Sequence, residues 1–191
     1  MKTLFFALCL LFSCVSNAAL IKFEPQYNSY QVGDVITLNL TISDFSETLG
    51  GFSAEILFPV SGLELLDWQF GIGFDDGLGK IPPYEEFDRL AGFLFLEDIS
   101  ALEADETILA VNQGTRFTFA SVSFLALEAG DLLFSFDPAK FVLLGFVSND
   151  LINVTGTDLT LTVQPAQVPA PATAMLLLAG LGVLLRRQTR K

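Results

Sequence analysis

The chain has 191 residues, with 22 Asp or Glu, 10 Lys or Arg, no His and a net charge of −12 at neutral pH. Because the two cysteines, Cys9 and Cys14, lie near its start, the later residues can form no disulfide and supply no Ser–His or Cys–His nucleophile pair. All 22 acidic residues fall between positions 19 and 164, and this acidity disfavours nucleic acid and anionic membrane surfaces as partners.

The first eighteen residues have the three regions of a secretory signal peptide. Lys2 precedes an apolar stretch at positions 4–12, and the sequence Ser16-Asn17-Ala18 follows, which predicts export and cleavage after Ala18. A second interpretation is that Leu11-Phe12-Ser13-Cys14 is a lipoprotein cleavage box and that Cys14 becomes a lipidated first residue. Both interpretations place the following domain outside the cytoplasm.

Residues 19–164 are predicted to form one domain, because a chain of about 150 residues can bury a single core. Its apolar residues alternate with polar ones, as in half-buried β-strands. At 35–43 the apolar side consists of Ile36, Leu38, Leu40 and Ile42. The same alternation predicts strands at 52–58, 66–70, 116–127 and 159–163, and further strands are expected at 93–96, 132–136 and 141–147.

The apolar pattern at 116–127 changes phase near Ser121, which predicts a β-bulge. A short helix is expected at 100–111, and no long amphipathic helix is evident. Eight or more short strands with turn sequences between them favour an all-β fold, an antiparallel β-sandwich.

Four short segments mark turns and strands of this domain in chain order. They are Val32-Gly33-Asp34, Leu49-Gly50-Gly51-Phe52, Leu63-Glu64-Leu65-Leu66, and the stretch 118–129 that closes with Ala129-Gly130. Residues 19–164 therefore resemble a cohesin-like domain, a jelly-roll sandwich related to family 2 and 3 carbohydrate-binding modules. The resemblance implies a module that binds dockerins, or a recognition unit of extracellular or polysaccharide-associated proteins, and it implies no catalysis.

Residues 68–89 are predicted to form a long surface loop, because glycines and prolines are mixed there with aromatic and acidic residues. The rings could stack on sugars, and the carboxylates could accept hydrogen bonds from sugar hydroxyls. The candidate ligand-binding residues are Trp68, Phe74, Asp75, Asp76 and Tyr84. The alternative is that Trp68 and Phe70 belong to the core and that the rest is an irregular crossover.

Acidic pairs at 75–76, 85–86 and 97–98 permit a calcium site, since Ca²⁺ takes about six to eight oxygen ligands. None has the spacing of an EF-hand loop, and a solvated acidic surface explains them more simply. Two carboxylates could also hydrolyse a glycosidic bond, but nothing in the sequence marks one pair over another. The sequence therefore predicts a non-enzymatic domain without a cofactor, with calcium binding as the lesser alternative.

The end of the chain combines an apolar run with a basic terminus. Positions 172–185 carry no charge, and Arg186, Arg187, Arg190 and Lys191 follow. As a helix this run covers about 21 Å, or about 27 Å if it begins at Val168, against a hydrocarbon core of about 30 Å. Because Lys and Arg stay on the cytoplasmic side, a transmembrane helix at 172–185 with the domain outside is expected. The alternative is an amphipathic helix packed on the domain.

The tail at 165–191 resembles the C-terminal sorting signal of the PEP-CTERM family, whose members are processed by exosortases in Gram-negative bacteria. The matching residues are Val168, Pro169, Pro171, Arg186 and Arg187, and Ala170 replaces the family's glutamate. The resemblance implies an exosortase-type partner, with the tail either cleaved or kept as an anchor. The overall expectation is a secreted or surface-anchored module that binds polysaccharide or matrix. The alternatives are a dockerin-type protein-binding module and a structural surface protein without a dedicated ligand.

Overall fold

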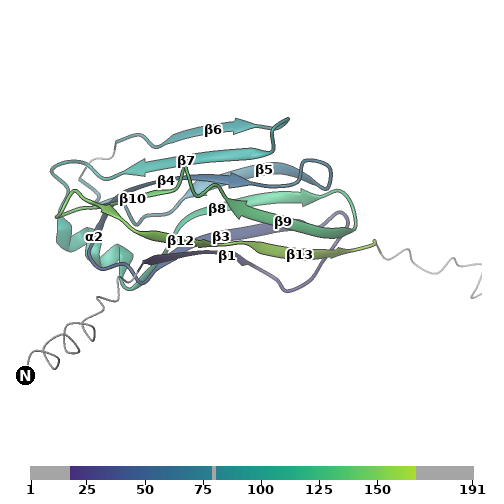
Figure 1. Ribbon diagram of the computed structural model, residues 1–191, viewed down its shortest axis with the longest axis horizontal. Coiled ribbons are helices and arrows are strands. Elements are labelled where there is room, and N and C mark those ends of the chain that lie inside the picture. Colours follow the sequence, from purple (N-terminus) through teal and green to yellow (C-terminus); the bar gives the residue numbers. More distant parts are fainter. Residues whose placement is uncertain (1–17, 79–80, 167–191) are drawn as a thin grey trace, which may run out of the picture.

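Apolar alternation along β3 (Val35–Ser43) directs one side of that strand into the core of the computed structural model, which describes residues 18–78 and 81–166. Ile36, Leu38, Leu40 and Ile42 are all fully buried, as predicted. The strand lies in the middle of one of two sheets, and the sheets pack face to face as a β-sandwich (Figure 1). The predicted all-β architecture is therefore confirmed for the described residues.

The smaller sheet has five strands among the described residues. In spatial order they are β12 (Val154–Thr157), β1 (Ala19–Pro25), β3, β8 (Arg116–Ala126) and β5 (Leu63–Phe70). Leu40 pairs with Ala120, whereas the next residue, Thr41, pairs with Thr118, so Phe119 is an extra residue on β8. This register shift confirms the bulge predicted near Ser121 and explains why the apolar pattern changes phase there.

The larger sheet has eight strands within the described part of the chain. They are β6 (Tyr84–Asp88), β7 (Phe93–Ile99), β4 (Leu49–Leu57), β9 (Gly130–Phe136), β13 (Leu159–Gln164), β2 (Tyr30–Gln31), β10 (Val142–Gly145) and β11 (Leu151–Ile152). One edge of β4 pairs with β7, and its other edge pairs first with β10 and then with β9. Both edges of β4 are therefore covered by neighbouring strands.

Near its described beginning the chain passes from β1 in the smaller sheet to β2 in the larger sheet, and near its described end it passes from β12 to β13 in the same way. β1 runs parallel to β12 in the smaller sheet, and β2 runs parallel to β13 in the larger sheet. Every strand of the part of the chain that the structure describes lies within residues 19–164, as does the described hydrophobic core. A fragment with these boundaries therefore contains the packing that forms the sandwich.

Aromatic rings from the two sheets interleave in the core. Phe23 on β1 stacks on Phe136 of β9 with ring centroids 4.1 Å apart, and Phe119 on β8 meets Phe52 of β4 edge-on at 4.6 Å. Each such pair contributes about 1 kcal/mol beyond the burial of apolar area. The inner faces of both sheets are thus filled by packing, so a partner has to bind on the outside of the sandwich.

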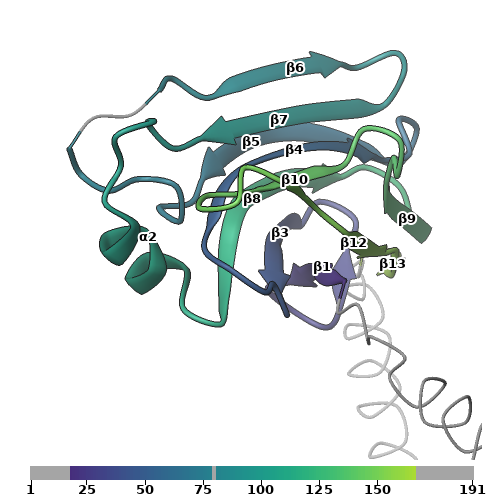
Figure 2. The same ribbon diagram turned by 60° about the vertical axis from the view of Figure 1, so that its left-hand side comes forward.

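The helix α2 (Glu106–Gln113) lies at one end of the sandwich (Figure 2). It begins after Asp105, whose side chain accepts a hydrogen bond from the Thr107 N–H at 2.8 Å, as an N-cap does. The prediction of a short helix is therefore confirmed, but the helix lies further along the chain than the predicted range 100–111. The cap explains the difference, because Asp105 holds the preceding residues out of the helix.

Two details of the sequence prediction are wrong around residues 66–89. Leu66 is 48 % exposed, because the register of β5 against β8 shifts between Leu65 and Asp67 and turns Leu66 away from the core. The predicted loop at 68–89 is also shorter than expected. Its end forms β6, which pairs with β7 along its whole length.

The predicted leader at 1–18 and sorting tail at 165–191 lie outside the described residues, apart from residues 18, 165 and 166. The tail includes the transmembrane helix predicted at 172–185 and the motif residues Val168, Pro169, Pro171, Arg186 and Arg187. Within the described ranges, no helix has the length and apolar character needed to cross a membrane.

Candidate binding face

The outer face of the larger sheet is built from rows of side chains that run across its strands. Alternate residues of a strand point to the same side, so the outer residues of β4 are Gly51, Ser53, Glu55 and Leu57. Gly51 lies opposite Ile99 of β7 on one edge and Leu144 of β10 on the other. The missing side chain of Gly51 therefore leaves a gap in the middle of an otherwise apolar row.

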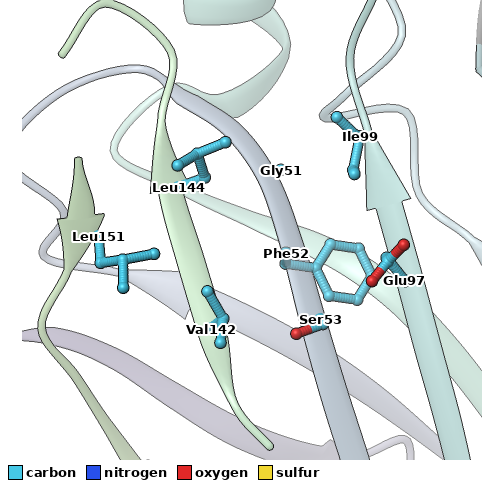
Figure 3. Close-up of a pocket in the computed structure, with 8 residues that line it drawn as sticks. All are labelled: Gly51, Phe52, Ser53, Glu97, Ile99, Val142, Leu144 and Leu151. Atoms are coloured by element: carbon cyan, nitrogen blue, oxygen red, sulfur yellow. The ribbon is translucent and has the colours of Figure 1, made fainter. Parts of the chain in front are cut away.

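A depression of about 240 Å³ lies over this gap. Figure 3 shows Val142 and Leu144 on one side of β4, Ile99 and Glu97 on the other, and Leu151 beyond β10. A Cβ atom at Gly51 would lie 3.1 Å from the Asp98 carbonyl oxygen and 3.2 Å from Ile99 Cγ1. We call this depression the Gly51 socket and define it by Gly51, Ile99, Val142, Leu144 and Leu151.

The walls of the Gly51 socket are apolar and accessible. Leu151 is 73 % exposed, and Ile99 and Val142 are each 38 % exposed. Scattered exposed apolar residues are ordinary on a protein surface, but a group around one depression marks an interaction site. The socket therefore offers a partner a place to bury apolar side chains.

One acidic side chain borders the socket on the side of β7. Glu97 lines the depression and lies opposite Ser53, with Tyr84 beside it on β6, whereas Glu86 and Asp88 lie further along β6, opposite Phe95 and Phe93. The Glu97 carboxylate at the rim favours a partner with a basic side chain.

Lys140, on the same face, already has an acidic partner. It donates a hydrogen bond to the buried carboxylate of Glu55, and this bond raises the pKa of Lys140. The same ammonium lies 5.5 Å from the centroid of the Phe93 ring. Lys140 and Glu55 thus largely neutralise each other and leave Glu97 to set the charge beside the socket.

The outer face of the smaller sheet has a different character. Its hydroxyl and amide groups bond to one another: Thr37 to Ser123 at 3.1 Å, and Ser121 to Asn39 at 2.8 Å. Arg116 also pairs there with Glu24. Of the two outer faces, the one around the Gly51 socket is therefore better suited to apolar contact.

The structure separates the five residues that the sequence marked as candidate ligand-binding residues. Phe74 is only 1 % exposed and lies between the rings of Phe52 and Phe117 at 5.4 and 5.5 Å. Its predicted role as an exposed sugar platform is therefore wrong, because the ring is part of the core. Trp68 is partly buried against the core, as the alternative interpretation of that residue expects.

Asp75 and Asp76 shape the turn that follows Phe74. Asp75 Oδ1 accepts the Gly77 N–H at 2.8 Å, and Asp76 accepts the N–H groups of Leu78 and Asp105, both at 2.9 Å. The bonds from Leu78 and Asp105 lower the pKa of Asp76. These carboxylates hold the loop against the start of α2, and Asp76, which is 5 % exposed, is not accessible to a sugar.

Tyr84 is the candidate that does reach the outer face of the larger sheet. Its ring is 53 % exposed and meets Phe95 edge-on at 6.0 Å. Sequence reasoning missed the socket beside it, although a Gly-Gly pair at the start of a strand marks a point of close approach. Within residues 18–78 and 81–166, no three acidic side chains are close enough to hold a metal ion.

No protein-family model matches the chain, and no curated protein matches it either. Solved structures of cohesins are similar to it in fold. The seventh ScaB type I cohesin of Pseudobacteroides cellulosolvens has a TM-score of 0.63 at 12% identity, covering 80% of this chain and 96% of that one. A type II cohesin from the cellulosome of Acetivibrio cellulolyticus has a TM-score of 0.61 at 17% identity, with 75% and 95% covered.

A type I cohesin–dockerin complex from Clostridium thermocellum has a TM-score of 0.61 at 11% identity, with 78% of this chain and 93% of that chain covered. Identities this low establish the fold alone. The described domain is therefore a cohesin-like β-sandwich.

Proposed function

We propose that the chain is a secreted, non-enzymatic protein-binding module of the cohesin type, and that it binds its partner through the outer face around the Gly51 socket. The gathering of exposed apolar side chains on that face carries this assignment. The likeness to cohesins supports it, since some of those structures contain a dockerin bound to the cohesin.

The socket favours a protein surface over a polar ligand because its walls offer few hydrogen-bonding groups. Full burial of one exposed leucine such as Leu151 contributes about 2 kcal/mol to binding. That gain requires an apolar partner group. A few such contacts at the centre of an interface, with a polar rim, are typical of protein recognition.

Polysaccharide binding is a second candidate, and the position of Tyr84 favours it. The tyrosine ring lies on the same outer face next to Phe95, where a sugar ring could stack. If this function is correct, Tyr84→Ala reduces retention on the exopolysaccharide of the source bacterium. Protein binding at the socket predicts little effect of that substitution, because Tyr84 lies outside the group that defines the socket.

Export and surface attachment belong to the same proposal. The leader at 1–18 and the PEP-CTERM-like tail at 165–191 support a secreted domain that an exosortase-type enzyme processes or that stays anchored at the surface of a Gram-negative bacterium. The acidic domain between them suits an extracellular position, where it stays soluble and meets partners rather than nucleic acid.

The decisive experiment compares two exposed leucines on opposite sheets. Leu151→Asp places a charge in the socket, whereas Leu66→Asp places the same charge on β5 of the smaller sheet. The wild-type fragment 19–164 and both variants are used to capture exported proteins of the source bacterium. Each protein captured by the wild type is then purified and titrated calorimetrically against all three.

The expected result is a partner whose Kd rises roughly 30-fold with Leu151→Asp, which corresponds to the loss of about 2 kcal/mol, and stays unchanged with Leu66→Asp. Equal affinity for the wild type and Leu151→Asp would remove the socket from the binding site. Retention of purified exopolysaccharide, with no protein that binds in the titrations, would favour the second candidate.

A further inference from the structure

We infer that the outer edge of β6, which no described strand covers, receives an extended, basic segment of a partner protein as a further antiparallel strand of the larger sheet. This site lies at the margin of the sandwich and does not depend on the function proposed for the Gly51 socket. Its backbone groups, the aromatic rings beside it and its acidic side chains each supply one part of the inference.

The strand β6 has one paired edge and one open edge. All five of its residues are exposed, they pair with β7 without a register shift, and no strand within the described residues pairs with the other edge (Figure 2). Alternate residues of an antiparallel strand direct their N–H and C=O groups to opposite edges, so about half of these groups point outward along about 17 Å. Such a row is a template for another strand.

The other margins of the two sheets are less suited to strand addition. In the part of the chain that the structure describes, β2 and β11 have two residues each and β12 has four. The edge strand β5 is longer, but its register shifts between Leu65 and Asp67, and such an irregularity hinders the approach of a further strand. The longest regular open edge of the described sheets is therefore that of β6.

Aromatic rings lie on the inner side of this edge. Phe87 is 39 % exposed, and its ring centroid lies 6.3 Å from that of Phe58 and 6.4 Å from that of Trp68 on β5. Pairs of aromatic and β-branched side chains on neighbouring strands stabilise a sheet. An added strand would therefore gain most from Val, Ile or an aromatic residue opposite Phe87.

The acidic side chains of β6 determine which strand can be added. Glu85, Glu86 and Asp88 fill three of its five positions, and like charges opposite each other destabilise a strand pair. A second copy of β6, paired antiparallel around Glu86, would place two Glu86 carboxylates face to face. The edge therefore disfavours a copy of itself and favours a strand with Lys or Arg opposite Glu85 and Glu86.

The probe is the synthetic peptide Thr-Thr-Lys-Val-Lys-Lys-Tyr-Thr-Thr, whose central five residues would lie opposite Asp88 to Tyr84 in antiparallel pairing. It is titrated into the fragment 19–164, which contains the whole described core. The control is the same peptide with Glu in place of each Lys. We expect the basic peptide to bind at least tenfold more tightly than the acidic one, because only its charges complement those of β6.

Two further versions of the basic peptide test whether it binds as a strand. One has N-methyl groups on the first, third and fifth central amides, and the other has them on the second and fourth. Only alternate amides of an added strand face β6, so one version should lose binding at least tenfold while the other retains it. In the complex, hydrogen exchange should slow at alternate amides of β6, because these become bonded to the peptide.

Variants of the domain then locate the site. Glu85→Lys and Glu86→Lys should each weaken the basic peptide about tenfold, and a Lys→Glu change at the opposite peptide position should restore binding. Glu128→Lys in an exposed turn and Leu151→Asp in the Gly51 socket should leave the affinity unchanged.

Equal binding of the two methylated peptides would overturn the inference, as would unchanged hydrogen exchange in β6 or failure of the basic peptide to bind. A dimer of the fragment with slowed exchange in β6 would assign the edge to a second copy and overturn it as well. Loss of peptide binding with Leu151→Asp would place the peptide in the socket and also overturn it. The proposed function is tested separately, by the response of the native partner to Leu151→Asp.

Discussion

Gln113, the last residue of α2, is hydrogen-bonded to both backbone groups of Leu49, the first residue of β4. Its Oε1 accepts the Leu49 N–H and its Nε2 donates to the Leu49 carbonyl, each at 2.8 Å, and Nε2 also donates to the Gly73 carbonyl at 2.9 Å. The side chain is almost completely buried. One amide therefore fixes the helix, the loop around Gly73 and the strand that carries Gly51 relative to one another.

Replacing Gln113 with Leu should lower the free energy of unfolding by about 3 kcal/mol. The substitution leaves the buried backbone groups of Leu49 without their partner, and each such group costs about 1–3 kcal/mol. Urea denaturation followed by tryptophan fluorescence measures the change. Val111→Ala, at a position of α2 that is 76 % exposed, is the control and should shift the midpoint little. Equal midpoints for Gln113→Leu and the wild type would show that the amide does not hold these elements together.

Phe74→Ala should destabilise the domain by about 3–5 kcal/mol, because it removes a large buried ring and leaves a cavity. Tyr84→Ala, at an exposed position on β6, should cost less than about 1 kcal/mol. Thermal unfolding of both variants measures the difference. A stable Phe74→Ala variant would contradict the assignment of this ring to the core.

Asp76 should make the domain sensitive to acid. Hydrogen bonds from Leu78 and Asp105 lower its pKa in the folded state below the ordinary value of 3.8, so the unfolded chain takes up the proton first as the pH falls. The stability contributed by Asp76 is therefore complete well above pH 3.8 and is lost as the pH falls through the folded-state pKa.

Asp76→Asn should thus be less stable than the wild type at pH 7, and its stability should depend less on pH below about pH 4. Chemical denaturation between pH 2 and 7 measures both curves, and Asp131→Asn on the exposed part of β9 is the matched control. If the stability of Asp76→Asn and that of the wild type changed with pH in parallel, the hydrogen bonds from Leu78 and Asp105 would not depend on the charge of the Asp76 carboxylate.

The mature protein should begin at Ala19. The first strand starts at this residue, and its N–H donates to the Asn153 carbonyl at 2.8 Å, so the folded domain begins where the predicted cleavage site ends. Mass spectrometry of the exported protein should find Ala19 as the amino-terminal residue. A lipid-modified chain that begins at Cys14 would instead support the alternative interpretation of the leader.

Strands whose apolar residues alternate could be predicted from the sequence, because burial of one face requires that pattern. The pattern holds for β3, where Ile36 and its alternate neighbours are all buried. It fails for β6, because Tyr84–Asp88 is an edge strand with every residue exposed and thus carries no apolar alternation. It fails also for β11 and β12, which are too short to show a period.

The binding face was harder to predict than the fold. The Gly51 socket depends on the register that aligns Gly51 with Ile99 and Leu144. These residues are far apart in the chain, so the sequence around any one of them does not predict the register. The prediction that the Phe74 ring is exposed was wrong for a related reason. A phenylalanine between glycines and aspartates resembles an exposed loop residue, but the turn made by Asp75 and Asp76 directs its ring inward.

The order of strands between the end of the domain and the socket bears on how the molecule would resist pulling. If the protein is held by its tail while a partner pulls on β4, tension enters at Gln164, runs along β13, passes to β9 and reaches β4 without leaving one sheet. β13 and β9 are paired over five residue pairs, whereas β9 and β4 are paired over two, Ile56 with Phe136 and Leu57 with Ser135. A pull on β4 would therefore load the short β9–β4 ladder first, and that ladder would set the force at which the partner is torn from its anchorage.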